Sequence, residues 1–282
     1  MNKGYIKIAM VLLSLVGYTQ NVAFASEQPS DVTKANPEPQ KTVFEEFPEL
    51  VCEDLDEILL AINHIMEASD LLIKLSKTGI DDYSSYSTEN GDKTIYSKKI
   101  GNVDIGRLHL TIPSTSNYSN VLKKLWDFSH NKKPYKKLIN GNLARVYSKY
   151  LILLEKFNTD LNYTPLTKNY ALAAKVKKSN DTTVIICPSR ALNYLGQIDD
   201  ETEIKEMLEN TQSIETDIDP EEALTKLGTN IAGFVVKKGD DNVQVTYINA
   251  GIMIQVIFIL IFSYIFRLDI NIINYSLFYT YF

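Results

Sequence analysis

The chain has 282 residues, of which 23% are charged and 45% hydrophobic, a balance typical of a globular protein. Its 29 basic and 35 acidic residues give a formal net charge of −6, which argues against a nucleic-acid partner. Two cysteines and three histidines, without metal-ligand or phosphate-loop spacing, predict no metal site and no cofactor.

Two segments are predicted to precede the folded part. Residues 1–25 combine Lys3 and Lys7, an apolar run and small residues before Ser26, the pattern of a removed signal peptide. Residues 26–43 are polar and rich in proline, which predicts a flexible leader. We therefore expect a secreted protein with one α+β domain over residues 44–250.

The domain is expected to begin with helical structure. Between residues 44 and 77, apolar residues recur every three or four positions, which predicts one long helix or two shorter ones that meet near Ser69 and Asp70. Residues 83–100 then predict a β-hairpin around an Asn-Gly turn.

A third strand and a short helix follow. Residues 103–112 predict the strand, and Gly106 predicts a bulge because Ile105 breaks the alternation of apolar and polar residues. Residues 116–128 predict an amphipathic helix that carries Trp126.

The second half of the chain is predicted to be mainly antiparallel sheet. Strands are expected in residues 142–157, 168–189 and 233–247, and short helices in residues 198–212 and 214–226. The total is one antiparallel curved sheet of about seven or eight strands. The order helix, three strands, helix and antiparallel run is typical of a helix-grip fold and argues against βαβ units.

The cysteines and histidines give no catalytic prediction. Cys52 and Cys187 form either a disulfide or two buried free thiols. His64, His109 and His130 are each expected to be structural or solvated. We therefore predict that the protein is not an enzyme. An unrecognised hydrolase ranks third, after the two functions given below.

Six short sequences carry a resemblance to a known domain. They are Leu125-Trp126-Asp127, Arg145-Val146-Tyr147, Asn169-Tyr170-Ala171, Thr182-Thr183-Val184-Ile185-Ile186, Ala232-Gly233-Phe234-Val235-Val236 and Val245-Thr246-Tyr247-Ile248. Their order and spacing resemble the START lipid-binding domain. More narrowly, residues 44–250 look like the START-like fam-a family of secreted malaria-parasite proteins.

The resemblance implies a function without covalent chemistry. A START-like domain encloses one lipid, so we expect a monomer that binds a phospholipid, with phosphatidylcholine implied, and carries it between parasite or host-cell membranes. No Arg-x-Leu-x-acid export signal follows the signal peptide, so export to the host cell is implied by the resemblance alone. The alternative is a surface interaction protein with the same fold and no bound lipid.

The candidate lipid-binding residues come from strand alternation and from the resemblance. Alternation directs Lys175 and Lys177 to one face of their strand. The other face, toward an apolar space that is either packed core or cavity wall, carries Tyr170, Leu172, Ala174 and Val176. Arg145 and Tyr147 share a face, where the resemblance implies contact with a lipid headgroup. Trp126 is expected either in the core or at the pocket mouth.

Residues 251–282 depart from the resemblance. A START-like domain would continue into an amphipathic helix that covers the cavity, but residues 252–266 are almost wholly apolar. We expect the closing helix to be missing. Without it, the chain should fold poorly or bind lipid more weakly than a complete relative. The tail is then translated non-coding sequence, a membrane anchor that is short for the bilayer, or a substitute cover.

Overall fold

The fold is known from a computed structural model. It describes residues 43–87, 93–126, 142–157, 168–187, 192, 203–227 and 230–251, all within one compact unit. The predicted signal peptide, nearly all of the leader, His130 and residues 252–282 of the predicted tail lie outside the described residues.

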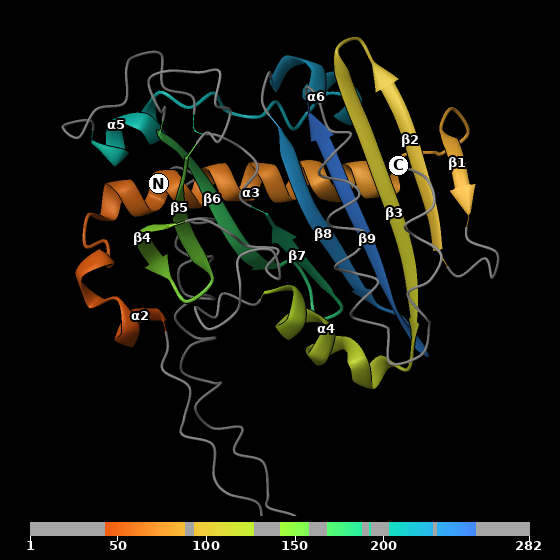
Figure 1. The fold of residues 1–282 in the computed structure, drawn as a ribbon, viewed down its shortest axis with the longest axis horizontal. Helices are drawn as coiled ribbons and strands as arrows, with labels where there is room; N and C mark the ends of the chain where they lie inside the picture. The colour runs from red at the N-terminus through yellow and green to blue at the C-terminus, as the bar shows by residue number, and fades with distance from the viewer. Residues whose placement is uncertain are drawn as a thin grey trace, which may run out of the picture. The chain divides into compact units, whose positions relative to one another are not determined.

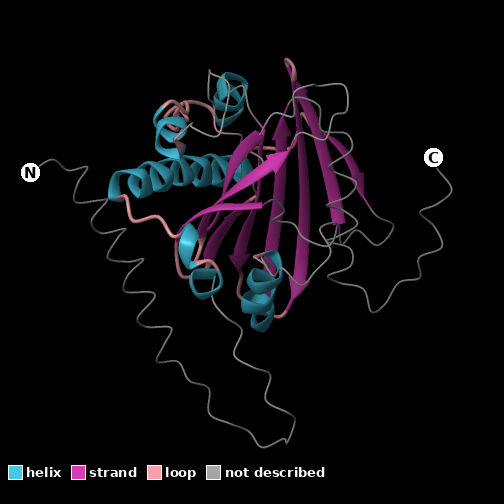
Figure 2. Cartoon of the chain, turned by 60° about the vertical axis from the view of Figure 1, so that its left-hand side comes forward, coloured by secondary structure: helices cyan, strands magenta, loops and turns pink. Residues whose placement is uncertain are grey.

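One antiparallel sheet forms the centre of the described fold (Figures 1 and 2). Its nine strands are β1 (Ser84–Ser87), β2 (Lys93–Ile100), β3 (Val103–Pro113), β4 (Asn142–Ser148), β5 (Leu151–Phe157), β6 (Lys168–Lys177), β7 (Thr182–Ile186), β8 (Ile231–Lys238) and β9 (Asn242–Gly251). Their order across the sheet is β1-β2-β3-β9-β8-β7-β6-β5-β4, so the third strand pairs with the last. The predicted α+β class with a curved antiparallel sheet is confirmed, and it is consistent with a START-like helix-grip fold.

Short helices and one long helix accompany the sheet. They are α2 (Val43–Glu46), η1 (Pro48–Leu50), α3 (Leu55–Lys77), η2 (Thr115–Asn117), α4 (Tyr118–Leu125), α5 (Ile204–Glu209) and α6 (Pro220–Leu227). Among the helices of the described residues, none is both long enough and apolar enough to span a membrane.

Helix α3 is held at both ends by side chains. The Asp54 carboxylate caps its start by accepting hydrogen bonds from the backbone N–H groups of Asp56 and Glu57, at 2.8 and 3.3 Å. At its end, Arg107 of β3 donates to the carbonyls of Leu75, Ser76 and Thr78. The helix runs unbroken through Ser69, whose hydroxyl donates to the Met66 carbonyl within the helix.

The two faces of the sheet are covered by different helices. On one, the α3 face, α3 crosses β6 to β9, as Figure 1 shows. The other, the α4 face, carries a buried cluster to which α4 contributes Leu122 and Leu125. The sheet members of this cluster are Leu108, Leu110, Ile185, Cys187, Ala232, Phe234, Val236, Val243, Val245 and Tyr247. Because both faces are covered, β8 and β9 are buried along most of their length.

This double burial explains one wrong prediction. Gly106 marks no bulge, because it pairs with Ser97 of β2 and Asn249 of β9 in registers without interruption. Ile105 breaks the apolar alternation only because it is buried on the α3 face, whereas Leu108 and Leu110 are buried on the α4 face. The open question about Cys52 and Cys187 is also settled, since both are buried and neither forms a disulfide.

The environment of His109 predicts a dependence of stability on pH. Burial lowers the pKa of His109 below its usual 6.5, and the charges of Arg107 and Lys237 lower it further. Below pH 6.5 the unfolded chain therefore binds a proton that the folded chain does not, and stability falls as pH drops through the folded pKa. In urea titrations at about pH 7.5 and 5.5, His109→Asn should lose less stability on acidification than the natural chain. An equal loss would contradict this origin.

Candidate functional site

The α4 face carries a row of large side chains beside a row of small ones. The large row joins Leu108, Tyr247, Phe234 and Ile185, which pair in register across β3, β9, β8 and β7. Two residues further along these strands, Gly106 pairs with Asn249, and Asn249 with Ala232. Cys187 and Ala173 continue this small row, the Cys187 backbone N–H donating to the Ala232 carbonyl at 2.9 Å. We call this row the trough, because its side chains are smaller than those of the neighbouring row.

Asn249 gives the trough an unusual polar group. The residue is only 3% exposed, and its Nδ2 has no hydrogen-bond partner. A buried amide that makes no hydrogen bond destabilises the fold, so such groups are rare in folded proteins. An acceptor oxygen on a bound apolar molecule would satisfy Nδ2. The trough therefore has the chemistry of a site for an amphiphile.

Helix α4 and Trp126 close one end of the same face. The Tyr118 hydroxyl of α4 lies 2.8 Å from the Thr183 hydroxyl of β7. Trp126 ends α4 and packs against two clusters, the one described above and a second one. The second consists of Val146, Ile152, Leu154 and Ala173, with residues of α2 and η1 packed against it. Trp126 is thus partly buried against the core of the α4 face, and its contribution to lipid binding stays a prediction.

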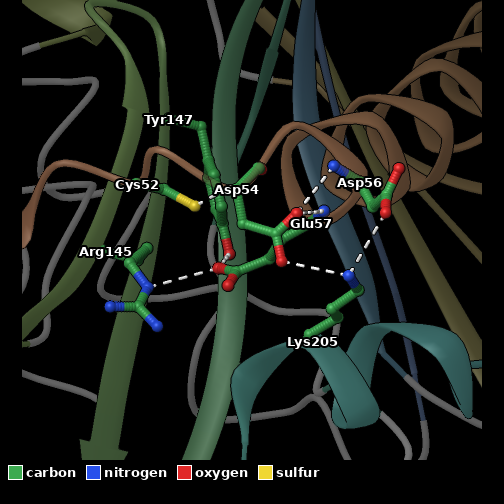
Figure 3. Close-up of polar contacts among 7 residues, drawn as sticks. All are labelled: Cys52, Asp54, Asp56, Glu57, Arg145, Tyr147 and Lys205. Carbon is green, nitrogen blue, oxygen red and sulfur yellow. Dashed lines mark hydrogen bonds and ion pairs between the residues drawn. The ribbon is translucent and has the colours of Figure 1, made fainter.

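Arg145 and Tyr147 meet on the opposite side of the sheet, at the start of α3 (Figure 3). Both donate to one carboxylate oxygen, Oε1 of Glu57, the Tyr147 hydroxyl at 2.9 Å and the Arg145 Nε at 3.2 Å. Glu57 is 4% exposed, so the guanidinium supplies the countercharge that a buried carboxylate needs. The prediction that the two residues lie together is confirmed. Their role in headgroup binding stays a prediction.

Burial changes the acid–base properties of this cluster. It raises the pKa of Tyr147, and the neighbouring Glu57 carboxylate raises it further, so the phenol stays protonated and donates. Burial likewise raises the pKa of the Cys52 thiol, which makes it a poor nucleophile. Lys205 of α5 lies 3.0 Å from the Asp54 carboxylate and 3.4 Å from that of Asp56 (Figure 3). The cluster therefore joins α3 to β4 and α5.

The register places the predicted alternating residues on the α3 face. Ala174 pairs with Ile186, and Ile186 with Gly233, where an added Cβ would lie 2.6 Å from Leu72 Cδ1 of α3. Tyr170, Leu172 and Val176 have the same parity as Ala174. Their contribution to lipid binding stays a prediction, one that requires the ligand to lie between α3 and the sheet.

Sequence reasoning missed Asn249, Glu57 and Lys175. Alternation places Lys175 on the face of β6 opposite Ala174, and its pairing with Ile185 shows that this is the α4 face. Residues 171–174 are all buried, so alternation cannot separate the two faces of β6. The available signals were a lysine within a long apolar strand, an asparagine within another, and a glutamate on the apolar side of a helix.

A polar cavity of about 330 Å³ lies beside α3 as well. It is lined by Leu60, Asn63, His64, Met66, Glu67, Asp70, Leu208, Glu209, Thr211, Ser213 and Thr216. His64 Nε2 lies 2.8 Å from the Leu208 carbonyl, and Glu67 accepts from the Ile214 backbone N–H. Polar groups form much of this lining, which therefore fits acyl chains less well than the trough does.

No family model and no curated protein matches the chain, so the fam-a resemblance is not confirmed. Solved structures do match. The chain is similar to human StAR-related lipid transfer protein 5, with 7% identity, coverage of 74% of this chain and 90% of that one, and a TM-score of 0.41. It is also similar to the lipid transfer and protein localization domain of human StarD13, with 10% identity, coverage of 68% of this chain and 85% of that one, and a TM-score of 0.31. A third similar structure is a STAR-related lipid transfer protein fragment from Xanthomonas axonopodis, with 10% identity, coverage of 62% of this chain and 86% of that one, and a TM-score of 0.33.

Proposed function

We propose that this chain is a lipid-binding protein that holds one phospholipid on the α4 face and carries it between membranes. The observation that carries the proposal is the trough with the Nδ2 of Asn249, which is buried without a hydrogen-bond partner. Acyl chains fit beside small apolar side chains, and an ester oxygen would accept from Nδ2. No step of this function breaks a covalent bond.

The free energy of hydration sets what such a site must do. Exposing a methylene to water costs about 0.8 kcal/mol, so the roughly thirty methylenes of a diacyl lipid would cost on the order of 24 kcal/mol. A carrier must therefore shield nearly all of the acyl surface. The extended apolar α4 face, with α4 and Trp126 at one end, supplies one wall of such a shield.

The sequence resemblance supports the finer parts of the proposal. It implies phosphatidylcholine as the phospholipid and parasite or host-cell membranes as donors and acceptors. The pattern of residues 1–25 supports secretion, and we propose a monomeric carrier. A surface interaction protein of the same fold is the competing function, and it would need no bound lipid.

A transfer assay separates these two functions. The full chain is mixed with donor vesicles that contain a fluorescent phosphatidylcholine and with unlabelled acceptor vesicles. A lipid carrier moves the label in proportion to protein concentration. Trp126, the single tryptophan of the chain, should change its emission when lipid occupies the α4 face. No transfer and no change in emission would favour the interaction protein.

Filling the trough should block binding. Ala232→Leu adds bulk in the middle of the trough, and we expect at least a tenfold loss of lipid uptake. Ala174→Leu is the matched control, because it adds the same bulk at a buried position on the α3 face. Both variants lose stability through overpacking, so uptake is compared per folded molecule. A larger loss in Ala174→Leu would place the ligand on the α3 face instead.

A further inference from the structure

Two lysines converge on one aromatic ring beside the α4 face. Lys149 and Tyr150 form the turn between β4 and β5, and the Tyr150 carbonyl accepts from the backbone N–H of Lys175 at 2.9 Å. The Nζ atoms of Lys175 and Lys149 lie 4.7 and 5.2 Å from the centroid of the Tyr150 ring. Trp126 meets the same ring edge-on, with the centroids 6.3 Å apart.

Three other partly buried lysines of the described fold have carboxylate partners. Lys98, Lys178 and Lys205 lie 2.7, 2.9 and 3.0 Å from a carboxylate oxygen. In the described part of the chain, no carboxylate lies within ion-pair distance of Lys149 or Lys175. The fold thus holds two positive charges near each other without a countercharge from the described residues.

Holding these charges together has an electrostatic cost. Burial lowers the pKa of Lys175, and the charge of Lys149 lowers it further. The ring face offsets part of this cost, since its negative charge density attracts a cation that lies over it. An anion bound between the two ammonium groups would remove the repulsion.

The position of Lys175 suggests what that anion is attached to. Its side chain shares a face with Ala173 of the trough, two residues and so about 6.6 Å along the same strand. A molecule with an acyl body in the trough would place its polar end near the lysines. The cations around Tyr150 would repel a quaternary ammonium group there. The pair therefore suits a headgroup whose net charge is negative.

We propose that Lys149 and Lys175 bind the phosphate of a phospholipid with a negatively charged headgroup. This inference rests on the proposed lipid-binding function and changes its ligand class, from the phosphatidylcholine that the resemblance implies to an anionic phospholipid. Among phospholipids, the site favours phosphatidic acid and similar anionic lipids over phosphatidylcholine. Inorganic phosphate shares the same chemistry and would bind more weakly, since it lacks the apolar body.

The test compares an anionic and a neutral lipid with the same acyl chains. The full chain, Lys149→Gln, Lys175→Gln and the double variant are incubated with phosphatidylcholine vesicles that contain either phosphatidic acid or diacylglycerol. Protein is then separated from the vesicles, and its bound lipid is quantified. Lys238→Gln, an exposed lysine on β8, is the control with the same change in net charge.

Each single variant should bind phosphatidic acid about tenfold more weakly, because it loses one charge-assisted hydrogen bond, and the double variant should lose more. Diacylglycerol uptake should be unchanged, and Lys238→Gln should match the natural chain with both lipids. Without ligand, Lys175→Gln should unfold at the same temperature or higher, since it removes repulsion between the lysines. Equal phosphatidic acid uptake by the double variant and the natural chain would overturn the proposal.

A titration with inorganic phosphate separates this proposal from the proposed function. If no lipid is taken up but phosphate binds only when both lysines are present, the phosphate site stands and the lipid function fails. If diacylglycerol is taken up but phosphatidic acid uptake does not depend on the lysines, lipid binding stands and the phosphate site fails. If neither lipid nor phosphate binds, both fail.

Discussion

Gly233→Val is expected to lower the free energy of unfolding by about 3 kcal/mol, through overpacking between β8 and α3. A Cβ at this position would lie 2.6 Å from the Ile185 carbonyl oxygen and 2.6 Å from Leu72 Cδ1. The leucine end is flexible, but the carbonyl belongs to a paired strand and cannot move alone. Strand β8 must therefore shift relative to β7, and the Leu72 side chain must move as well, which loosens the packing of α3 on the sheet.

Urea denaturation measures this effect, and Gly79 provides the control. A Cβ at Gly79 would be 3.7 Å from the nearest atom, an ordinary van der Waals contact. Gly79→Val should therefore change stability by about 0.5 kcal/mol or less. If both valine variants unfolded at similar urea concentrations, the close approach of α3 to β8 would be contradicted.

Glu57→Ala is expected to lower the free energy of unfolding by about 2–3 kcal/mol. The substitution removes the acceptor of the buried Tyr147 hydroxyl and the countercharge of Arg145. The side chain of Arg145 is 34% exposed, so water replaces part of its lost interaction and keeps the effect below that of a fully buried pair. Stability is again measured by urea denaturation, with the exposed Glu53→Ala as the control.

A double-mutant cycle tests whether the Glu57 contacts carry the loss. Tyr147→Phe alone removes one hydrogen bond, and it should cost much less in a chain that already carries Glu57→Ala. Additive effects of the two substitutions would show that the hydroxyl and the carboxylate do not interact. The hydrogen-bond geometry at the start of α3 would then be wrong.

Much of the fold could be predicted from local sequence. The apolar period of residues 55–77 predicts α3, and the β-branched runs on either side of polar turns predict the β6–β7 and β8–β9 hairpins. Helix α3 continues through Ser69 because the hydroxyl bonds within the helix. The pairing of β3 with β9 is a contact between distant segments, and no local pattern specifies it.

The candidate site was harder to predict because its residues depend on which face of a doubly covered sheet they occupy. Alternation places Lys175 opposite Ala174 but does not show what covers that face, since β6 is buried on both sides near Ala173 and Ala174. Arg145 and Tyr147 were found as a pair, but their partner Glu57 comes from a distant helix. For Asn249 the sequence signal is weak, an asparagine within a mostly apolar strand, and only the burial of its Nδ2 without a hydrogen-bond partner makes it notable.

Native mass spectrometry with lipid extraction tests the central claim most directly. The chain is expressed in full in eukaryotic cells, purified without detergent and weighed intact, and its bound molecules are then extracted and identified. We predict a complex with one phospholipid per chain, which Ala232→Leu would lose. A folded protein that carries no lipid, and takes none from added vesicles, would contradict a lipid site on the α4 face.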